Sequence, residues 1–168
     1  MKKLFLIFFL FFALFNALKA QEVSLEKGWK FSTGDSSTWA SPTYNDQQWK
    51  PINLDKSWEE QGYPKYDGFG WYRLHVTIPS TIKEQAYLKD SIRINLGVID
   101  DNDEVYLNGT LIGKYGGNNG PITSSKYGPR TYVIAADNPA ILWDKENVFA
   151  IRIFDTGGPG EYMARRIA

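Results

Sequence analysis

The sequence of 168 residues contains no cysteine and only one histidine, His75. The lack of cysteine excludes disulfide bonds and a lipid-anchored cysteine. The single histidine also limits catalysis, because a serine nucleophile needs a base beside it and only one imidazole is present. A catalytic serine that uses a histidine base is therefore possible in this chain only if it lies beside His75.

Long hydrophobic runs are absent except for one, residues 4–15. This run follows two lysines and leads to the small residues Ala17 and Ala20, a pattern typical of a secretory signal peptide. Its length is too short for a membrane-spanning helix, which needs about 20 residues. We expect cleavage after Ala20 and export of residues 21–168 as a single domain, either secreted or periplasmic. This exported part has a net charge of about −3, which argues against a nucleic-acid partner.

Phenylalanine is rare outside the apolar run, whereas the exported part keeps all six Trp and all ten Tyr. Both rings carry a polar edge and suit half-hydrated surfaces and interfaces. They also fill the cores and corners of β-sandwiches. Composition alone leaves both roles open.

The sequence shows no long amphipathic helix pattern and no internal repeat. It consists instead of short segments in which apolar and polar residues alternate. Residues 70–79 alternate strictly, with Leu74 and Val76 on one face and Arg73 and His75 on the other. This period of two predicts a half-buried strand.

Further strands are expected at residues 91–97, 130–134 and 147–155. Within residues 104–113, Asn108-Gly109 separates two short apolar runs and predicts a two-residue hairpin turn. Seven or eight short strands between Gly, Pro, Asn and Asp clusters predict an all-β fold, an antiparallel β-sandwich of the jelly-roll type.

The order of several segments resembles a known domain family. These segments are GWKFSTGDSSTWASPTYNDQQWKPI, YDGFGWYR, LGVIDDNDEVYLNGTLIG, GPRTYVI and ENVFAIRIFDTGGPG, which lie within residues 28–160. Together they resemble the galactose-binding-like jelly roll, the sugar-binding domain of family 2 glycoside hydrolases of the β-galactosidase type and of bacterial sialate O-acetylesterases. The resemblance implies a non-catalytic domain that binds carbohydrate or lies against a catalytic barrel and shapes its cleft.

Ser36 lies in Gly-Asp-Ser, the tripeptide that carries the nucleophile in a large class of esterases. Those enzymes activate the serine with a distant Asp-x-x-His, but the position three before His75 is Tyr72. We therefore assign no catalytic residue and interpret the tripeptide as a turn in which Asp35 accepts hydrogen bonds from nearby backbone amides. His75 is expected to be an exposed strand residue.

Four carboxylates occur within five residues, at Asp100, Asp101, Asp103 and Glu104. Such oxygen ligands can hold calcium, although the spacing lacks the glycine and the distant glutamate of an EF-hand loop. An ordinary turn before a strand is the favoured interpretation, and a pair of glycosidase acids is the weakest one. No metal site and no cofactor are assigned, with calcium left as an alternative.

Residues 57–73 hold the best candidates for ligand contact, because four rings lie among glycines and a proline in a predicted loop. Sugars stack their C–H faces on such rings, and polar side chains bind their hydroxyls. The candidate ligand-binding residues are Trp58, Tyr63, Tyr66, Asp67, Trp71 and Arg130. Two have a structural alternative: Trp71 can be a core residue of a strand, and Arg130 can pair with an acidic loop.

The end of the chain departs from the family pattern. The family continues into a closing strand, whereas residues 161–168 form a basic tail without alternation. Two interpretations stay open, a truncated gene product or a stand-alone module with an altered last strand, and a missing strand would leave an open sheet edge.

The expected function is that of a secreted, non-catalytic module that binds carbohydrate within a glycan-degrading system. Its expected partners are a glycan and the catalytic domain of a larger enzyme. Two alternatives stay open. The chain can be a fragment of a glycoside hydrolase or a sialate O-acetylesterase, or an extracellular sensor or docking module that contacts proteins.

Overall fold

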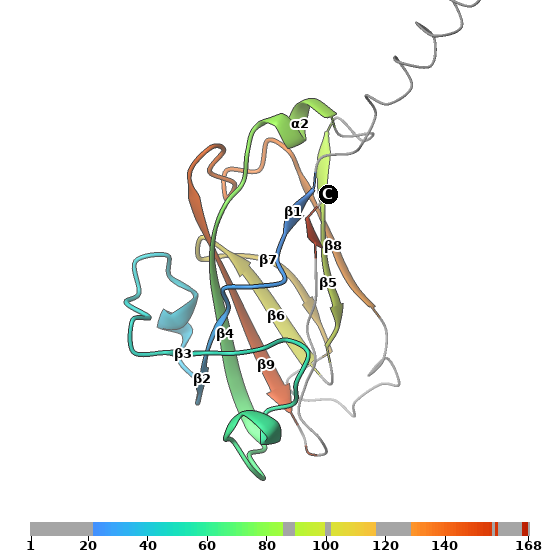
Figure 1. The fold of residues 1–168 in the computed structure, drawn as a ribbon. Coiled ribbons are helices and arrows are strands. Elements are labelled where there is room, and N and C mark those ends of the chain that lie inside the picture. The colour runs from blue at the N-terminus through green and yellow to red at the C-terminus, as the bar shows by residue number, and fades with distance from the viewer. Residues whose placement is uncertain are drawn as a thin grey trace, which may run out of the picture.

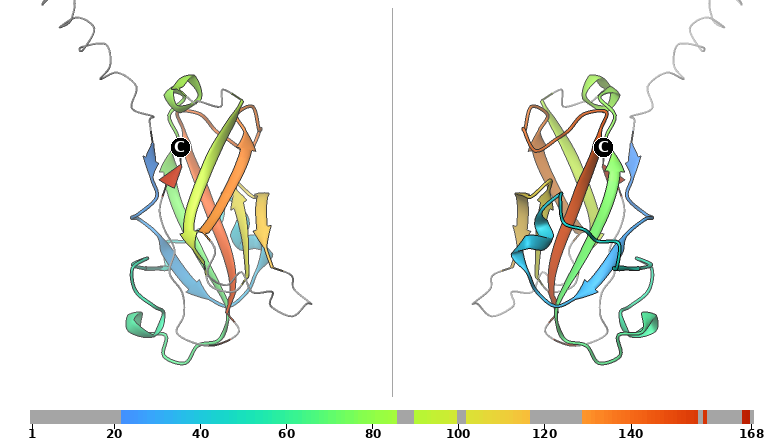
Figure 2. Two further views of the ribbon diagram at one scale, coloured as in Figure 1. Left: turned by 90° about the vertical axis from the view of Figure 1, so that its right-hand side faces the viewer. Right: turned by 90° about the vertical axis from the view of Figure 1, so that its left-hand side faces the viewer.

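The computed structural model shows two antiparallel β-sheets packed face to face (Figures 1 and 2). It describes residues 22–85, 90–99, 102–116, 129–155, 157 and 166–167. This architecture confirms the expected all-β sandwich. The predicted signal peptide, residues 1–20, lies outside the described residues. Among the described residues, no helix is both long and apolar enough to cross a membrane.

The larger sheet has the strand order β3-β2-β4-β9-β6-β7. Its strands are β3 (Lys50–Pro51), β2 (Lys30–Thr33), β4 (Gly68–Thr77), β9 (Glu146–Asp155), β6 (Asn102–Leu107) and β7 (Thr110–Tyr115). Strands β4 and β9 pair along their full length and form the middle of the sheet. These two strands are the longest of the sheet, and their register decides which side chains lie opposite one another at its centre.

The smaller sheet has the strand order β1-β10-β5-β8. Its strands are β1 (Val23–Ser24), β10 (Arg166–Ile167), β5 (Ser91–Val98) and β8 (Pro129–Ala135). Strand β10 belongs to the basic tail, for which the sequence left a missing last strand and an open sheet edge as one interpretation. In the structure β10 pairs with β1 on one side and with β5 on the other.

The core lies between the two sheets and consists of the inward-facing residues of both. Leu74, Val105 and Ile151 of the larger sheet and Ile92 and Ile94 of the smaller one are all buried. Their burial confirms the inner faces predicted from the period of two.

The predicted hairpin is confirmed, since Asn108 and Gly109 connect β6 to β7 with φ angles of 49° and 84°. Positive φ at both central residues gives the turn the twist that suits a two-residue hairpin. The Asn108 side chain also ties the turn to the sheet. Its Nδ2 donates to the Ala140 carbonyl and its Oδ1 accepts from the Val148 amide, both at 2.8 Å.

The outer face of β4 is buried over part of its length, at Trp71 and Arg73, whereas His75 on the same face is exposed. Trp71 and Arg73 are 1% and 0% exposed, because residues 34–49, including the short 3-10 helix η2 (Ser37–Ala40), cover this face (Figures 1 and 2). The remaining helical turns are η3 (Glu59–Gln61) and α2 (Thr81–Gln85). Alternation in the sequence thus identified the two faces of β4 but not the segment that covers one of them.

Candidate functional site

The candidate site lies on the outer face of the larger sheet, at the end where β4 begins and β9 ends (Figure 1). The register places Phe69 opposite Phe154 and Trp71 opposite Arg152. Arg152 lies in turn opposite Glu104 of β6. Because directly paired residues share one face of a sheet, these side chains form a single cross-strand array.

Next to this array, residues 34–49 cover the sheet with a second apolar cluster. Trp39 packs edge-on against Trp49 and Trp71, with ring centroids 5.1 and 6.1 Å apart. Ala150 of β9 is fully buried beneath them. This aromatic cover divides the outer face into a closed part, which includes Trp71, and an open part that holds the other residues of the array.

The guanidinium of Arg73 holds the covering segment to β4. Its Nε donates to Asp46 Oδ2 at 2.9 Å. Its Nη1 donates to the carbonyls of Trp39 and Ser41, and its Nη2 donates to that of Tyr44 at 3.4 Å. A fully buried cation is stable only when it is paired and hydrogen-bonded, and here the covering segment supplies both kinds of partner.

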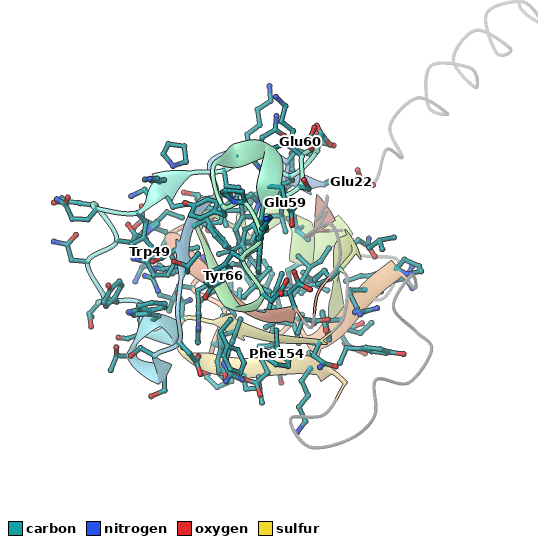
Figure 3. All side chains as sticks on the ribbon, turned by 90° about the horizontal axis from the view of Figure 1, so that it is seen from below. Glu22, Trp49, Glu59, Glu60, Tyr66 and Phe154 are labelled. Carbon is teal, nitrogen blue, oxygen red and sulfur yellow. The ribbon has the colours of Figure 1, made fainter. Side chains whose placement is uncertain are left out.

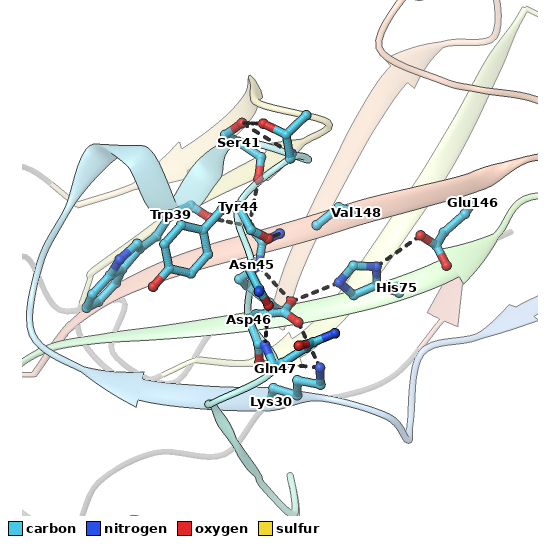
Figure 4. A network of polar contacts seen from close by, with 12 residues as sticks. Lys30, Trp39, Ser41, Tyr44, Asn45, Asp46, Gln47, His75, Glu146 and Val148 are labelled. Atoms are coloured by element: carbon cyan, nitrogen blue, oxygen red, sulfur yellow. Dashed lines mark hydrogen bonds and ion pairs between the residues drawn. The ribbon is translucent and has the colours of Figure 1, made fainter.

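Asp46 is the anionic centre of this contact and receives two further donors (Figure 4). Lys30 Nζ lies 2.7 Å from Asp46 Oδ1, and His75 Nε2 lies 2.8 Å from Oδ2. His75 is exposed on its strand, as predicted, and its Nδ1 lies 3.1 Å from Glu146. Burial alone raises the pKa of Asp46, but the hydrogen bonds from Lys30, Arg73 and His75 outweigh it and hold that pKa well below its ordinary value.

We expect stability to fall in acid because of Asp46. Since its folded-state pKa is depressed, its contribution is complete above the unfolded-state pKa of about 3.9 and is lost as the pH falls through the folded-state value. Urea unfolding at several pH values between 7 and 2.5 measures this loss. An Asp46→Asn variant should depend less on pH over that range, and an equal dependence would contradict the assignment.

Arg152 contacts several side chains in the open part of the outer face. Its Nε and Nη2 donate to the two carboxylate oxygens of Asp35, both at 2.7 Å, and its guanidinium lies 4.1 Å from the Phe69 ring centroid. Hydrogen bonds from Arg152 lower the pKa of Asp35. The Trp71 indole donates to the same carboxylate at 3.1 Å. This bidentate pair fixes a charged group on the surface in one orientation.

Glu104 extends the network to β6. Its Oε2 accepts from Tyr106 at 2.9 Å and from Arg152 Nη1 at 3.4 Å. Burial, followed by the hydrogen bond to Glu104, raises the pKa of Tyr106 to about 12, so this phenol stays a donor at neutral pH.

A pocket of about 150 Å³ adjoins the network between β6, β7 and β9. Its lining includes Asn102, Glu104, Lys114, Arg152 and Phe154. The Phe154 ring forms an apolar wall and packs on Phe69 with centroids 4.5 Å apart. In the view from below, Phe154 lies on the side of the molecule opposite Glu60 of η3 (Figure 3). The pocket therefore combines one aromatic surface with several polar groups.

Arg130 is not available to a ligand, because it is 3% exposed and forms a buried pair. Its Nε donates to Asp103 Oδ1 at 2.6 Å, and its guanidinium lies 3.9 Å from the Tyr115 ring centroid. The other Asp103 oxygen accepts from the Tyr132 hydroxyl. The structural alternative for Arg130, pairing with the acidic loop, is the one the structure shows. The pair neutralises the carboxylate that borders the pocket from the core side.

Two of the predicted ligand-binding rings are core residues. Trp58 is 0% exposed, packs on Phe31 at 4.9 Å and donates from Nε1 to the Tyr72 hydroxyl at 2.5 Å. Trp71 is 1% exposed beneath the aromatic cover. Neither ring presents a face to a ligand in this structure, because protein atoms occupy both sides of it.

The other predicted residues of residues 57–73 lie nearer the surface. Tyr66 is half-buried, and its hydroxyl donates to the Phe69 carbonyl at 2.8 Å. Tyr63 is half-buried against Phe31. Asp67 is exposed. The structure thus does not gather the six predicted residues into one site, and Asp67 is the most accessible of them.

The Gly-Asp-Ser tripeptide connects β2 to η2 and bends at Gly34, which has a φ angle of 103°. Ser36 precedes η2, and its hydroxyl lies 2.8 Å from that of Thr38. The expected partners of Asp35 were wrong, however. Asp35 accepts hydrogen bonds from the side chains of Trp71 and Arg152 rather than from backbone amides.

The acidic cluster proposed for calcium lies partly outside the described residues, which omit Asp100 and Asp101. Of its other members, Asp103 already accepts hydrogen bonds at both carboxylate oxygens, from Arg130 and from Tyr132. In the described part of the chain, no three His, Cys, Asp or Glu side chains gather as metal ligands do. Calcium binding at this loop stays a prediction.

Arg152 and Phe154 were not selected from the sequence, although they are central to the open array. Both alternate with the core residues of β9, and that position indicates only an outer face. Their importance comes from register, which places them beside Trp71 and Phe69 of β4. A single strand pattern carries no information about these neighbours.

The chain matches the family model of the β-galactosidase second all-beta domain over residues 33–158. It is 26% identical over 143 residues to a β-galactosidase of Bacteroides ovatus, and 28% identical over 142 residues to a putative β-glucuronidase of Formosa agariphila. The alignments cover 78% and 73% of this chain. They cover only 15% and 13% of the two relatives, so the chain spans a small part of their length.

Similar solved structures show the same fold. A β-glucuronidase of Bacteroides uniformis has a TM-score of 0.67 at 23% identity, covering 88% of this chain and 17% of that one. A glycosyl hydrolase family 2 member from Bacteroides cellulosilyticus has a TM-score of 0.65 at 20% identity, covering 87% and 20%. The resemblance to sialate O-acetylesterases stays a prediction. Because the family model spans most of its length, the chain belongs to the family of the β-galactosidase second all-beta domain, a β-sandwich domain of glycoside hydrolase family 2.

Proposed function

We propose that the chain is a non-catalytic carbohydrate-binding module of an exported family 2 glycosidase system. The observation that carries this proposal is the family match over residues 33–158, to a domain that takes its name from a β-galactosidase. The relatives named above act as a β-galactosidase and a putative β-glucuronidase, and this chain corresponds to about one seventh of their length. A module of this kind lies beside a catalytic domain and helps to hold the glycan.

Two features support export and sugar contact. The signal-peptide pattern of residues 1–20 supports a secreted or periplasmic location. The open array on the outer face supports sugar contact, because Phe154 offers an aromatic surface and Glu104 and Arg152 are fixed polar groups beside it. Sugars present apolar C–H faces and hydroxyls side by side and need both kinds of partner.

We expect the purified chain to bind at least one glycan on an array and to release no nitrophenol from 4-nitrophenyl β-galactoside or β-glucuronide. Chelator should leave the binding unchanged, because Asp103 is already engaged by Arg130 and Tyr132. Loss of binding with chelator would favour calcium instead. Hydrolysis by the chain would overturn the non-catalytic assignment. A folded chain without any glycan affinity would favour a protein-docking or sensor role.

A further inference from the structure

The pocket between β6, β7 and β9 has an apolar wall with a defined orientation. Phe154 lies opposite Phe69 in the register, and their rings are 4.5 Å apart with an interplanar angle of 36°. The guanidinium of Arg152 packs on Phe69 in turn, at 4.1 Å from its centroid. A ring supported in this way loses little conformational freedom when a ligand stacks on it.

The polar groups of the pocket include both donors and acceptors. Glu104 uses Oε2 for its bonds to Tyr106 and Arg152, and neither bond involves Oε1. Lys114 lies opposite Glu104 on the neighbouring strand and is exposed. None of the ion pairs among the described residues includes Lys114. Asn102 also lines the pocket, and its carboxamide adds one donor group and one acceptor group.

The charges around the pocket cancel. Arg152 is neutralised by Asp35 through a bidentate pair. Lys114 faces Glu104 across the strands. A ligand with a full negative charge would meet Glu104, and one with a full positive charge would meet Lys114. Neutral hydroxyls, which donate and accept, fit both groups at once.

The size of the pocket suits about one sugar ring. Its volume of about 150 Å³ is below the range of about 300–1,000 Å³ that is typical for drug-sized ligands. We propose that this pocket binds one neutral hexopyranose residue, with a C–H face on Phe154 and hydroxyls on Glu104 and Lys114. This inference rests on the proposed function and replaces the loop of residues 57–73 as the place of sugar contact.

The test is a titration of the full chain with methyl β-galactopyranoside, methyl β-glucopyranoside and methyl β-glucuronide, followed by NMR. Glu104→Gln and Lys114→Ala should each raise the Kd of a neutral glycoside at least about fivefold, because the first replaces a charged acceptor by a neutral one and the second removes a charged donor. Phe154→Leu should also weaken binding while it keeps an apolar contact with Phe69. The matched controls are Asp67→Asn in the predicted loop and Lys83→Ala on α2, and both should bind like the wild type.

The outcomes separate this site from the proposed function. Binding that weakens with Asp67→Asn but not with the pocket variants would overturn the pocket and leave the proposed function intact. Tighter binding of the glucuronide than of the neutral glycosides would overturn the neutral class of ligand. If a folded wild-type chain binds none of the three but binds another glycan on the array, the pocket assignment fails alone. Without affinity for any glycan, both proposals fail.

Discussion

Replacing Arg73 by alanine is expected to lower the free energy of unfolding by about 3–5 kcal/mol, the range found when one partner of a buried ion pair is removed. The side chain is 0% exposed and donates to Asp46 and to three carbonyls of the covering segment. Its loss leaves a carboxylate that is 5% exposed without its buried cation. Lys30 and His75 remain beside Asp46, and both are about one-third exposed.

The measurement is urea unfolding, together with near-ultraviolet circular dichroism to follow the aromatic cover. The variant should lose the signal of the packed Trp39, Trp49 and Trp71 rings at lower urea than the wild type. Arg93→Ala provides the matched control, since Arg93 is exposed on β5 and its loss should change stability by less than about 0.5 kcal/mol. A loss below about 1 kcal/mol for Arg73→Ala would show that the aromatic cluster alone retains residues 34–49.

The sequence predicted the strands and the hairpin well because those features depend on local patterns. A period of two identifies the inner face of a strand wherever that face meets a core, as for Leu74 and Ile151. The turn at Asn108-Gly109 needs positive φ at two adjacent positions, which few residue pairs accept. Both signals lie within a few residues of the structure they specify.

The covering segment could not be predicted in the same way. Arg73 alternates with core residues and has the appearance of a solvent-facing strand residue. Its partners Trp39, Ser41 and Asp46 lie 27 to 34 positions earlier in the chain. Burial of an arginine can be predicted only if the carboxylate and the carbonyls that pair with it are known. The pattern of a single sequence does not report such contacts.

The exposure of two candidate rings, Trp58 and Trp71, was misjudged for a related reason. Glycines and a proline around Trp58 and Trp71 predicted an exposed loop, yet both rings are buried and each indole N–H has an internal acceptor. Polar ring edges satisfied by Tyr72 and Asp35 allow such rings to sit in a core. The same ambiguity was visible from composition, which left both the interface role and the core role open. Only tertiary packing decides between them.

Trp58→Ala is expected to reduce stability by about 3–5 kcal/mol, as for other buried aromatic residues changed to alanine. The ring is 0% exposed and lies 4.9 Å from Phe31 and 5.8 Å from Tyr66, measured between centroids. Its removal creates a cavity and leaves the Tyr72 hydroxyl without the indole donor. Trp58→Phe should cost less, because it loses the hydrogen bond but fills part of the space.

Urea unfolding of both variants measures this effect, and glycan titration at low temperature tests whether the folded fraction still binds. If Trp58 is a core residue, the folded fraction keeps the wild-type Kd while the unfolding midpoint falls. A variant with wild-type stability and no affinity would instead place the sugar on the loop of residues 57–73. The change at Trp58 is therefore expected to alter stability but not affinity. None of the described side-chain contacts of Trp58 involves a residue that lines the pocket between β6, β7 and β9.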